Sequence, residues 1–291
     1  MPTPEDSLPP SLPPVGAGEL PAPVRVIAVA GGKGGVGKTT VAINLALALI
    51  DSGHRALVLD TDLGLGNVDV MLGLTPHFTL ADVFAGRCTL AETIITGPRG
   101  LLVVPASSGK RHMTELRPAE YAGLIHAFSE LRQPLDTMII DTATGISDSV
   151  LTFIQAAQDV IVTLCNEPAS MADAYALIRI LAQERGVKRV HVLANMTRSA
   201  TEGREMFKAL ARTSERCLNV VLDYAGAIPC DEWVRRAIQR QQAVVDAFPA
   251  SAAAAAFHEL ARCTEQWEAP AGPRGGVEFF VERLVASGVA I

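Results

Sequence analysis

Short apolar runs alternate with longer stretches of helical periodicity along most of the chain. The apolar runs are rich in Val, Ile and Leu and predict strands at residues 24–30, 56–60, 101–105, 137–141, 160–164, 190–194 and 224–229. The segments between them predict helices, including 41–52, 172–184 behind a capping box from Ser170 to Asp173, and 250–268. Strands that alternate with helices are typical of an α/β fold with a single, mostly parallel twisted sheet flanked by helices.

The two ends of the chain depart from this pattern. Residues 1–23 hold eight prolines and few large apolar residues, which predicts a disordered Pro-rich arm before a domain at 24–268. Residues 269–276 are typical of a linker. Residues 277–291 then predict a short amphipathic helix, whose apolar face consists of Val277, Phe280, Val281, Leu284 and Val285. This helix could bind a membrane or dock on the chain itself, and Glu278 and Glu282 weaken its attraction to anionic lipid.

Composition excludes several classes of protein. The 291 residues are 49% hydrophobic and carry a net charge of −6, so the chain can bury a large core and lacks a general attraction to nucleic acid. No apolar run approaches the roughly 18 residues of a membrane span, and the N-terminus lacks the pattern of a signal peptide. We therefore expect a cytoplasmic protein. The five cysteines form no C-x-x-C pair, which indicates neither a disulfide framework nor a zinc site.

The candidate chemistry starts at Gly31–Thr40, directly after the first predicted strand and before the first predicted helix. From Gly32 the segment matches G-x-x-x-x-G-K-T, a phosphate-binding loop whose backbone N–H groups and following helix N-terminus favour a polyphosphate. Lys38 is expected to reach the β- and γ-phosphates, and the Thr39 hydroxyl to bind Mg²⁺. Lysine occurs only five times in the chain, and the loop carries a second one, Lys33. That lysine is therefore a further candidate for phosphate contact.

Carboxylates follow two other predicted strands at the edge where parallel sheets bind ligands. Asp141 ends the strand at 137–141 and is expected to support Mg²⁺, or otherwise to cap the next helix. Asp60 and Asp62 follow the second strand; one of them can orient or deprotonate an attacking water while the other supports the Mg²⁺ shell, or they serve as capping residues. Asn195 follows the strand at 190–194, where it could read an adenine edge or serve as an ordinary turn residue.

These motifs together resemble a known family. The loop Lys33-Gly-Gly-Val-Gly-Lys38-Thr39 resembles the deviant Walker A motif of the MinD/ParA group of ATPases, and the chain is most similar to that group's flagellar-number branch, FlhG/FleN. The segments that carry the closer resemblance start at Asp60, Leu72, Asp141, Glu167, Val192 and Phe279, and the resemblance extends over residues 24–285. It implies a MinD-like P-loop NTPase fold and a nucleotide site for ATP or ADP with Mg²⁺.

The resemblance also implies roles for individual residues. Lys33 would cross to the nucleotide of a partner subunit in an ATP-dependent homodimer, and Lys33, Lys38 and Asp62 would be the catalytic residues. Thr39, Asp141 and Asp60 would support the metal. The nucleotide-binding set would be Gly32, Lys33, Gly34, Gly35, Val36, Gly37, Lys38, Thr39 and Thr40, with Asn195 at the adenine and Pro229 and Asp231 as its neighbours.

The implied function is a slow regulatory ATPase that controls flagellar number as antiactivator of an AAA+ flagellar transcription activator (FleQ-like). An FlhF-type GTPase is a further partner in this branch, although residues 1–23 lack the activating Asp-Gln-Ala motif. The family also implies that the C-terminal helix targets the inner membrane. Two alternatives stay open. A ParA-type partition or positioning ATPase would need a basic face, for which Arg235, Arg236 and Arg240 are the dense candidates, and we do not expect direct DNA binding. The second alternative is a metal-cluster scaffold ATPase of the Mrp type, which usually has a C-x-x-C pair that this chain lacks.

Overall fold

The computed structural model describes residues 23–106, 118–131, 133–215, 217–268 and 278–283. Its centre is one eight-stranded sheet in the order β3-β4-β2-β5-β1-β6-β7-β8, in which every neighbouring pair is parallel except β3–β4. The strands are β1 (Arg25–Ala30), β2 (Ala56–Asp60), β3 (Ile95–Thr96), β4 (Leu102–Val104), β5 (Thr137–Asp141), β6 (Asp159–Leu164), β7 (Arg189–Thr197) and β8 (Val221–Pro229). The predicted fold class is confirmed.

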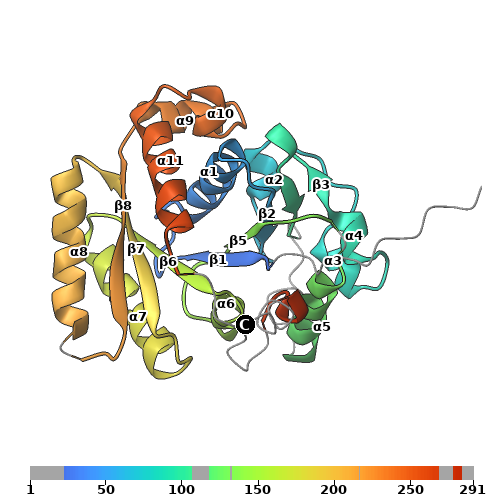
Figure 1. Cartoon of the computed structure of the whole chain (residues 1–291), viewed down its shortest axis with the longest axis horizontal. Helices are drawn as coiled ribbons and strands as arrows, with labels where there is room; N and C mark the ends of the chain where they lie inside the picture. Colours follow the sequence, from blue (N-terminus) through green and yellow to red (C-terminus); the bar gives the residue numbers. More distant parts are fainter. Residues whose placement is uncertain (1–22, 107–117, 132, 216, 269–277, 284–291) are drawn as a thin grey trace, which may run out of the picture.

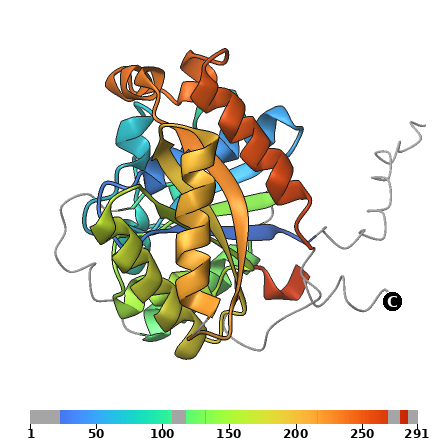
Figure 2. The same ribbon diagram turned by 90° about the vertical axis from the view of Figure 1, so that its left-hand side faces the viewer.

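Helices cover both faces of the sheet (Figure 1). On one face lie α1 (Lys38–Asp51), α10 (Val244–Ala247) and α11 (Ala252–Glu265), with α2 (Val68–Met71) and α9 (Glu232–Gln239) nearby. The other face carries α5 (Pro118–Ser129), α6 (Asp148–Gln155) and α7 (Pro168–Gln183). Helix α8 (Ala200–Glu215) packs on β7 and β8 at the sheet edge, in front in Figure 2. The connection from β2 to β4 holds α3 (Leu80–Phe84), α4 (Leu90–Thr93) and the 3₁₀ turn Pro98–Gly100.

The central strand β1 shows why both faces need cover. Its side chains alternate between the two hydrophobic clusters, with Val26, Ala28 and Ala30 in one and Ile27 and Val29 in the other, and all five are fully buried. A strand buried on both faces shows a continuous apolar run rather than alternation, which is why these strands could be recognised from the sequence.

Several predicted elements differ from the structure, and three of them are instructive. The two-residue strand β3 was not predicted because it is too short to carry an apolar pattern. Strand β8 starts at Val221, three residues before the predicted start. Helix α7 starts at Pro168 rather than behind a capping box at Ser170, because the Ser170 hydroxyl turns inward and accepts a hydrogen bond from the Cys165 N–H (3.0 Å). Proline suits the first helical position because its missing N–H needs no partner there.

The C-terminal segment returns to the body of the protein. Phe279 and Phe280 are fully buried and make edge-to-face contacts with Phe128 of α5, at centroid distances of 5.2 and 6.2 Å. Arg283 donates to the Leu131 carbonyl (2.6 Å). Of the predicted apolar face, Phe280 and Val281 lie in this docked stretch, whereas Val277, Leu284 and Val285 lie outside the described residues. Residues 1–22 of the predicted arm and the predicted linker also lie outside them. Residues 278–283 are therefore docked on the chain itself, which was one of the two alternatives for this segment.

No helix in the described ranges combines the length and the apolar character needed to cross a membrane.

Candidate functional site

The strand order brings the predicted site residues to one edge of the sheet. The carboxyl ends of β2, β5, β1, β6, β7 and β8 follow one another there, and the glycine-rich loop leaves β1 between β5 and β6. The residues predicted to contact nucleotide or metal lie at the ends of these strands, in the loops that follow them, or in the first turn of α1. Segments more than a hundred residues apart in sequence therefore meet around the glycine-rich loop.

The loop between β1 and α1 is tightly packed. Gly35 and Gly37 adopt φ values of 80° and 90°, in the left-handed region that glycine enters at no steric cost. A Cβ at Gly32 would collide with the backbone carbonyl of Asp173 in α7, and one at Gly37 would collide with the Asn195 side chain. Gly34, by contrast, faces open space. The loop is thus held between α7 and β7, with its backbone free to approach a ligand.

Lys38 is the first residue of α1, and its side chain is buried. Its Nζ donates to the Thr144 hydroxyl (2.7 Å), in the loop after β5. Burial lowers the pKa of Lys38, and the nearby carboxylates of Asp141 and Asp62 oppose that shift. These carboxylates favour the charged form of the ammonium, which can donate to phosphate oxygens. Thr39 and Thr40 follow in the first turn of the helix.

Lys33 forms an ion pair with Glu167, which lies between β6 and α7. The hydrogen bond from its ammonium to this carboxylate raises the pKa of Lys33. In the single chain the lysine is therefore held by a residue 134 positions away. The predicted contact with a partner subunit's nucleotide would require this pair to separate.

Two carboxylates face each other across β2 and β5. Asp60 and Asp141 are register partners and are almost completely buried. Burial raises the pKa of Asp60 to about 7, and burial together with the Asp60 charge raises the pKa of Asp141 well above its ordinary value. Thr39 hydrogen-bonds to Asp141, which opposes the shift. The buried Oδ1 of Asp141 has no hydrogen-bond partner, which is the arrangement expected of an oxygen that awaits a cation or its water.

Asp62 lies in the loop that leads from β2 to α2. Its Oδ1 accepts the N–H of Leu65 (3.0 Å), and its own N–H donates to Asp60 Oδ1 (3.0 Å). The Asp62 charge contributes to the pKa shifts of both Lys38 and Asp141, so its carboxylate lies near the phosphate-binding lysine. This position is compatible with a carboxylate that orients an attacking water.

The residues predicted for the adenine pocket are engaged with the chain itself. Asn195, at the bulge in β7, donates from Nδ2 to the Val36 carbonyl (2.8 Å), and its Oδ1 accepts the Met196 N–H (2.9 Å). Asp231 caps α9 by accepting the Trp233 N–H (2.9 Å) and also accepts the Ala253 N–H (3.0 Å). Pro229 ends β8 beside them. Asn195 thus links β7 to the phosphate-binding loop, and its contact with adenine stays a prediction.

Sequence reasoning missed two partners at this site. Thr144 and Glu167 received no role of their own, although both lie in the polar segments that follow predicted strands. A position after a parallel strand was the available signal, but it could not identify which lysine each residue would meet. In the described parts of the chain, no cluster of three or more His, Cys, Asp or Glu side chains could hold a metal on its own.

The sequence of the chain matches a known family and known relatives. The family model ParA, described as "NUBPL iron-transfer P-loop NTPase", matches residues 23–264. The chain is 54% identical to the Antiactivator FleN of Pseudomonas aeruginosa, over 92% of this chain and 97% of that protein. It is 29% identical to the Flagellum site-determining protein YlxH of Helicobacter pylori, over 75% and 74% of the two chains.

Solved structures agree on the fold. The cell division ATPase MinD of Pyrococcus furiosus superposes with a TM-score of 0.71 at 25% identity, covering 83% of this chain and 98% of that one. The septum site-determining protein MinD of Pyrococcus horikoshii, in complex with Mg-ADP, superposes with a TM-score of 0.70 at 24% identity over 84% and 96% of the chains.

Proposed function

The chain belongs to the ParA/MinD family of P-loop ATPases, and we propose that it regulates flagellar number as an ATP-dependent antiactivator. The observation that carries the proposal is the 54% identity to an antiactivator over 97% of that protein's length. The similarity to a flagellum site-determining protein supports the same assignment. ATP and Mg²⁺ are its cofactors, and the ATPase reaction would reset the regulatory state.

The residues of the site fit a Mg²⁺–nucleotide complex. The unpartnered Oδ1 of Asp141 and the neighbouring Thr39 hydroxyl would hold the metal, while the left-handed glycines Gly35 and Gly37 direct the loop backbone at the phosphates. When bound, Mg²⁺–ATP supplies the γ-phosphoryl group and balances the charge of its phosphates. Lys38 would bind the β- and γ-oxygens in exchange for its bond to Thr144.

Asp62 and Lys33 would link hydrolysis to assembly. Asp62 would orient the attacking water from the loop after β2. Lys33 would leave Glu167 and reach the nucleotide of a second subunit, so that ATP favours the homodimer through its higher affinity for that state. Hydrolysis would remove this preference, and the subunits would separate.

The proposed partner is an AAA+ flagellar transcription activator (FleQ-like), which the ATP-bound dimer would inhibit. An FlhF-type GTPase is a second candidate partner. Peripheral binding at the inner membrane through the C-terminal helix would require Phe279 and Phe280 to leave their contacts with Phe128.

A partition ATPase that travels on DNA is the less favoured alternative. Its candidate basic face on α9 is partly neutralised, because Arg235 and Arg236 both pair with Glu232. Arg240 stacks over the Phe248 ring at 5.1 Å. Salt-dependent DNA binding in ATP would favour this alternative.

The test is size-exclusion chromatography with light scattering in ADP and in ATP, with and without the activator. Wild type is expected to dimerise in ATP, Asp62→Ala to bind ATP, dimerise and retain the activator without hydrolysis, and Lys33→Ala to stay monomeric. Lys38→Ala should fail to bind a fluorescent ATP analogue. Hydrolysis by Asp62→Ala at the wild-type rate, or activator binding that does not depend on ATP, would contradict the proposal.

A further inference from the structure

The carboxylate of Asp60 is almost fully used by the backbone that follows it. Oδ1 accepts the N–H of Asp62 (3.0 Å), and Oδ2 accepts the N–H groups of Asn67 (2.9 Å) and Val68 (3.1 Å). Three of the roughly four lone-pair sites of a carboxylate are therefore occupied by loop 61–68. The loop is wrapped around one buried anion.

The wrapping determines where Asp62 lies. The residue before it, Thr61, donates both its N–H and its hydroxyl to the Asp141 carbonyl, each at 2.9 Å. The N–H of Asp62 is held by Asp60, and its carboxylate caps the turn at Leu65. Asp62 is thereby fixed between strand β5 and the Asp60 carboxylate, with its charge near Lys38.

Gly66 shows how closely the loop approaches the anion. A Cβ at this position would lie 2.9 Å from Asp60 Oδ2 and 2.5 Å from the Ala106 Cβ. Any other residue would push the loop away from the carboxylate. The approach therefore requires both the anion at position 60 and the missing side chain at position 66.

An ionised carboxylate at this place is unfavourable for stability by itself. It is completely buried and faces Asp141, a second buried carboxylate. Asparagine has nearly the same shape without the charge, but its Nδ2 group would point a donor at one or more of the three N–H donors. Only an acceptor on both oxygens satisfies the loop, so the anion serves the loop conformation at the expense of stability.

We propose that Asp60 is a positioning residue for ATP hydrolysis, which anchors loop 61–68 so that Asp62 faces the phosphates. The assignment rests on the proposed ATPase function and differs from the metal-support role that the sequence indicated, because backbone donors already occupy both oxygens. Asp60 acts through Asp62.

The experiment compares Asp60→Asn, Asp62→Asn and the double variant in the full-length chain. Asp60→Asn is expected to lower kcat by about 10- to 100-fold, the size of effect that a displacement of about 1 Å can cause, with the KM for ATP and the Mg²⁺ requirement within about threefold of wild type. The double variant should hydrolyse ATP no more slowly than Asp62→Asn alone. That lack of additivity is what an effect transmitted through Asp62 predicts.

Two further variants separate positioning from general loss of structure. Gly66→Ala displaces the same loop and leaves the charge in place, so it should also lower kcat and have no further effect in the Asp62→Asn background. Asp159→Asn removes a carboxylate that is only 13% exposed, at the amino end of β6, and should leave kcat unchanged.

The proposal is overturned if the losses from Asp60→Asn and Asp62→Asn multiply, or if Asp60→Asn mainly raises the Mg²⁺ concentration needed for activity. The second result would make Asp60 a metal-supporting residue. If Asp60→Asn does not fold, Gly66→Ala in both backgrounds decides the question in the same way. A wild-type protein that does not hydrolyse ATP would refute the proposed function itself and this role with it.

Discussion

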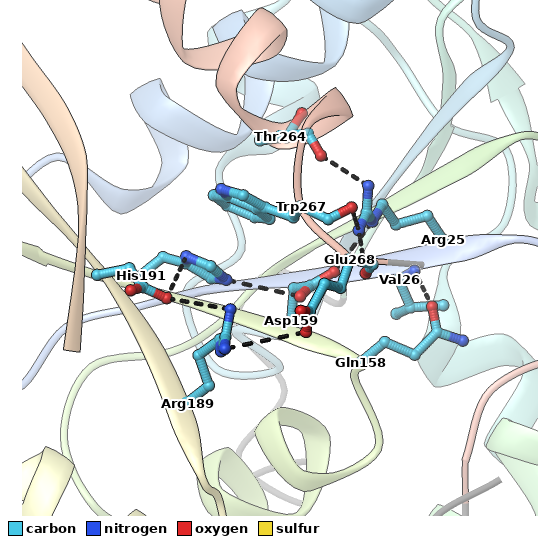
Figure 3. A network of polar contacts seen from close by, with 10 residues as sticks. Arg25, Val26, Gln158, Asp159, Arg189, His191, Thr264, Trp267 and Glu268 are labelled. Atoms are coloured by element: carbon cyan, nitrogen blue, oxygen red, sulfur yellow. Dashed lines mark hydrogen bonds and ion pairs between the residues drawn. The ribbon is translucent and has the colours of Figure 1, made fainter. Parts of the chain in front are cut away.

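Replacing Arg25 by methionine should destabilise the protein without changing its ATPase chemistry. Arg25 begins β1 at the amino end of the sheet and connects it to β6 and to the end of α11 (Figure 3). Its Nε donates to Asp159 Oδ2 (3.0 Å), and its other nitrogens donate to the carbonyl oxygens of Thr264 (2.6 Å), Trp267 (2.9 Å) and Glu268 (2.8 Å). Methionine keeps part of the apolar stem and removes all four hydrogen bonds.

The expected loss of unfolding free energy follows from the burial of the ion pair. The side chains of Arg25 and Asp159 are only 18% and 13% exposed, so the variant would leave a nearly buried carboxylate without its cation. Breaking a fully buried pair on one side costs about 3–5 kcal/mol, and the residual exposure reduces our expectation to about 2–4 kcal/mol. In a domain of this size the corresponding fall in Tm is about 5–15 °C.

Thermal and urea unfolding followed by circular dichroism measure the effect. The matched control is Arg55→Met. The Arg55 side chain pairs with Asp136 but is 54% exposed, so this pair should contribute little to stability. At a temperature where both variants are folded, their kcat should equal that of wild type, since Arg25 lies at the end of β1 remote from the phosphate-binding loop. If Arg25→Met unfolded at the wild-type temperature, our account of this network would be wrong.

Three further results are expected. Gly32→Ala should abolish binding of a fluorescent ATP analogue, because the added Cβ would collide with the Asp173 carbonyl. Gly34→Ala should still bind the analogue, because Gly34 faces open space. Equal affinities of the two variants would refute the packing argument. Phe280→Ala should reduce the free energy of unfolding in urea by about 3–5 kcal/mol, and Val281→Ala by much less, since Phe280 is fully buried; loss of stability in neither would show that the segment does not dock. In nucleotide-free protein, the raised pKa of Asp60, about 7 against an ordinary 3.8, stabilises the fold at low pH, and this contribution is lost as pH rises through 7. The difference in unfolding free energy between wild type and Asp60→Asn should therefore fall from pH 5 to pH 8, and a constant difference would contradict the assignment.

The sequence by itself determined the strands and the phosphate-binding loop, because these features depend on residues that are close together in the chain. Apolar runs identified seven of the eight strands, most of them buried on both faces. The spacing of glycines with Lys38 and Thr39 identified the phosphate-binding loop, because a turn of this kind needs particular residues at particular positions. The two-residue β3 was missed since so short a run carries no periodicity. The start of α7 was misplaced because Ser170, a good capping residue by type, bonds to Cys165 instead.

Only the tertiary structure decided which groups meet. The order β2-β5-β1-β6-β7 sets Asp60 opposite Asp141, brings Glu167 to Lys33 and joins Asn195 to Val36 across 159 residues. The sequence predicted that Asp60 supports the metal, whereas the structure led us to propose that it anchors loop 61–68. Its carboxylate accepts three backbone N–H groups of that loop, which have no partner within a strand. A residue's type and its place after a strand can be read from sequence, but its hydrogen-bond partners are set by the strands that pack beside it.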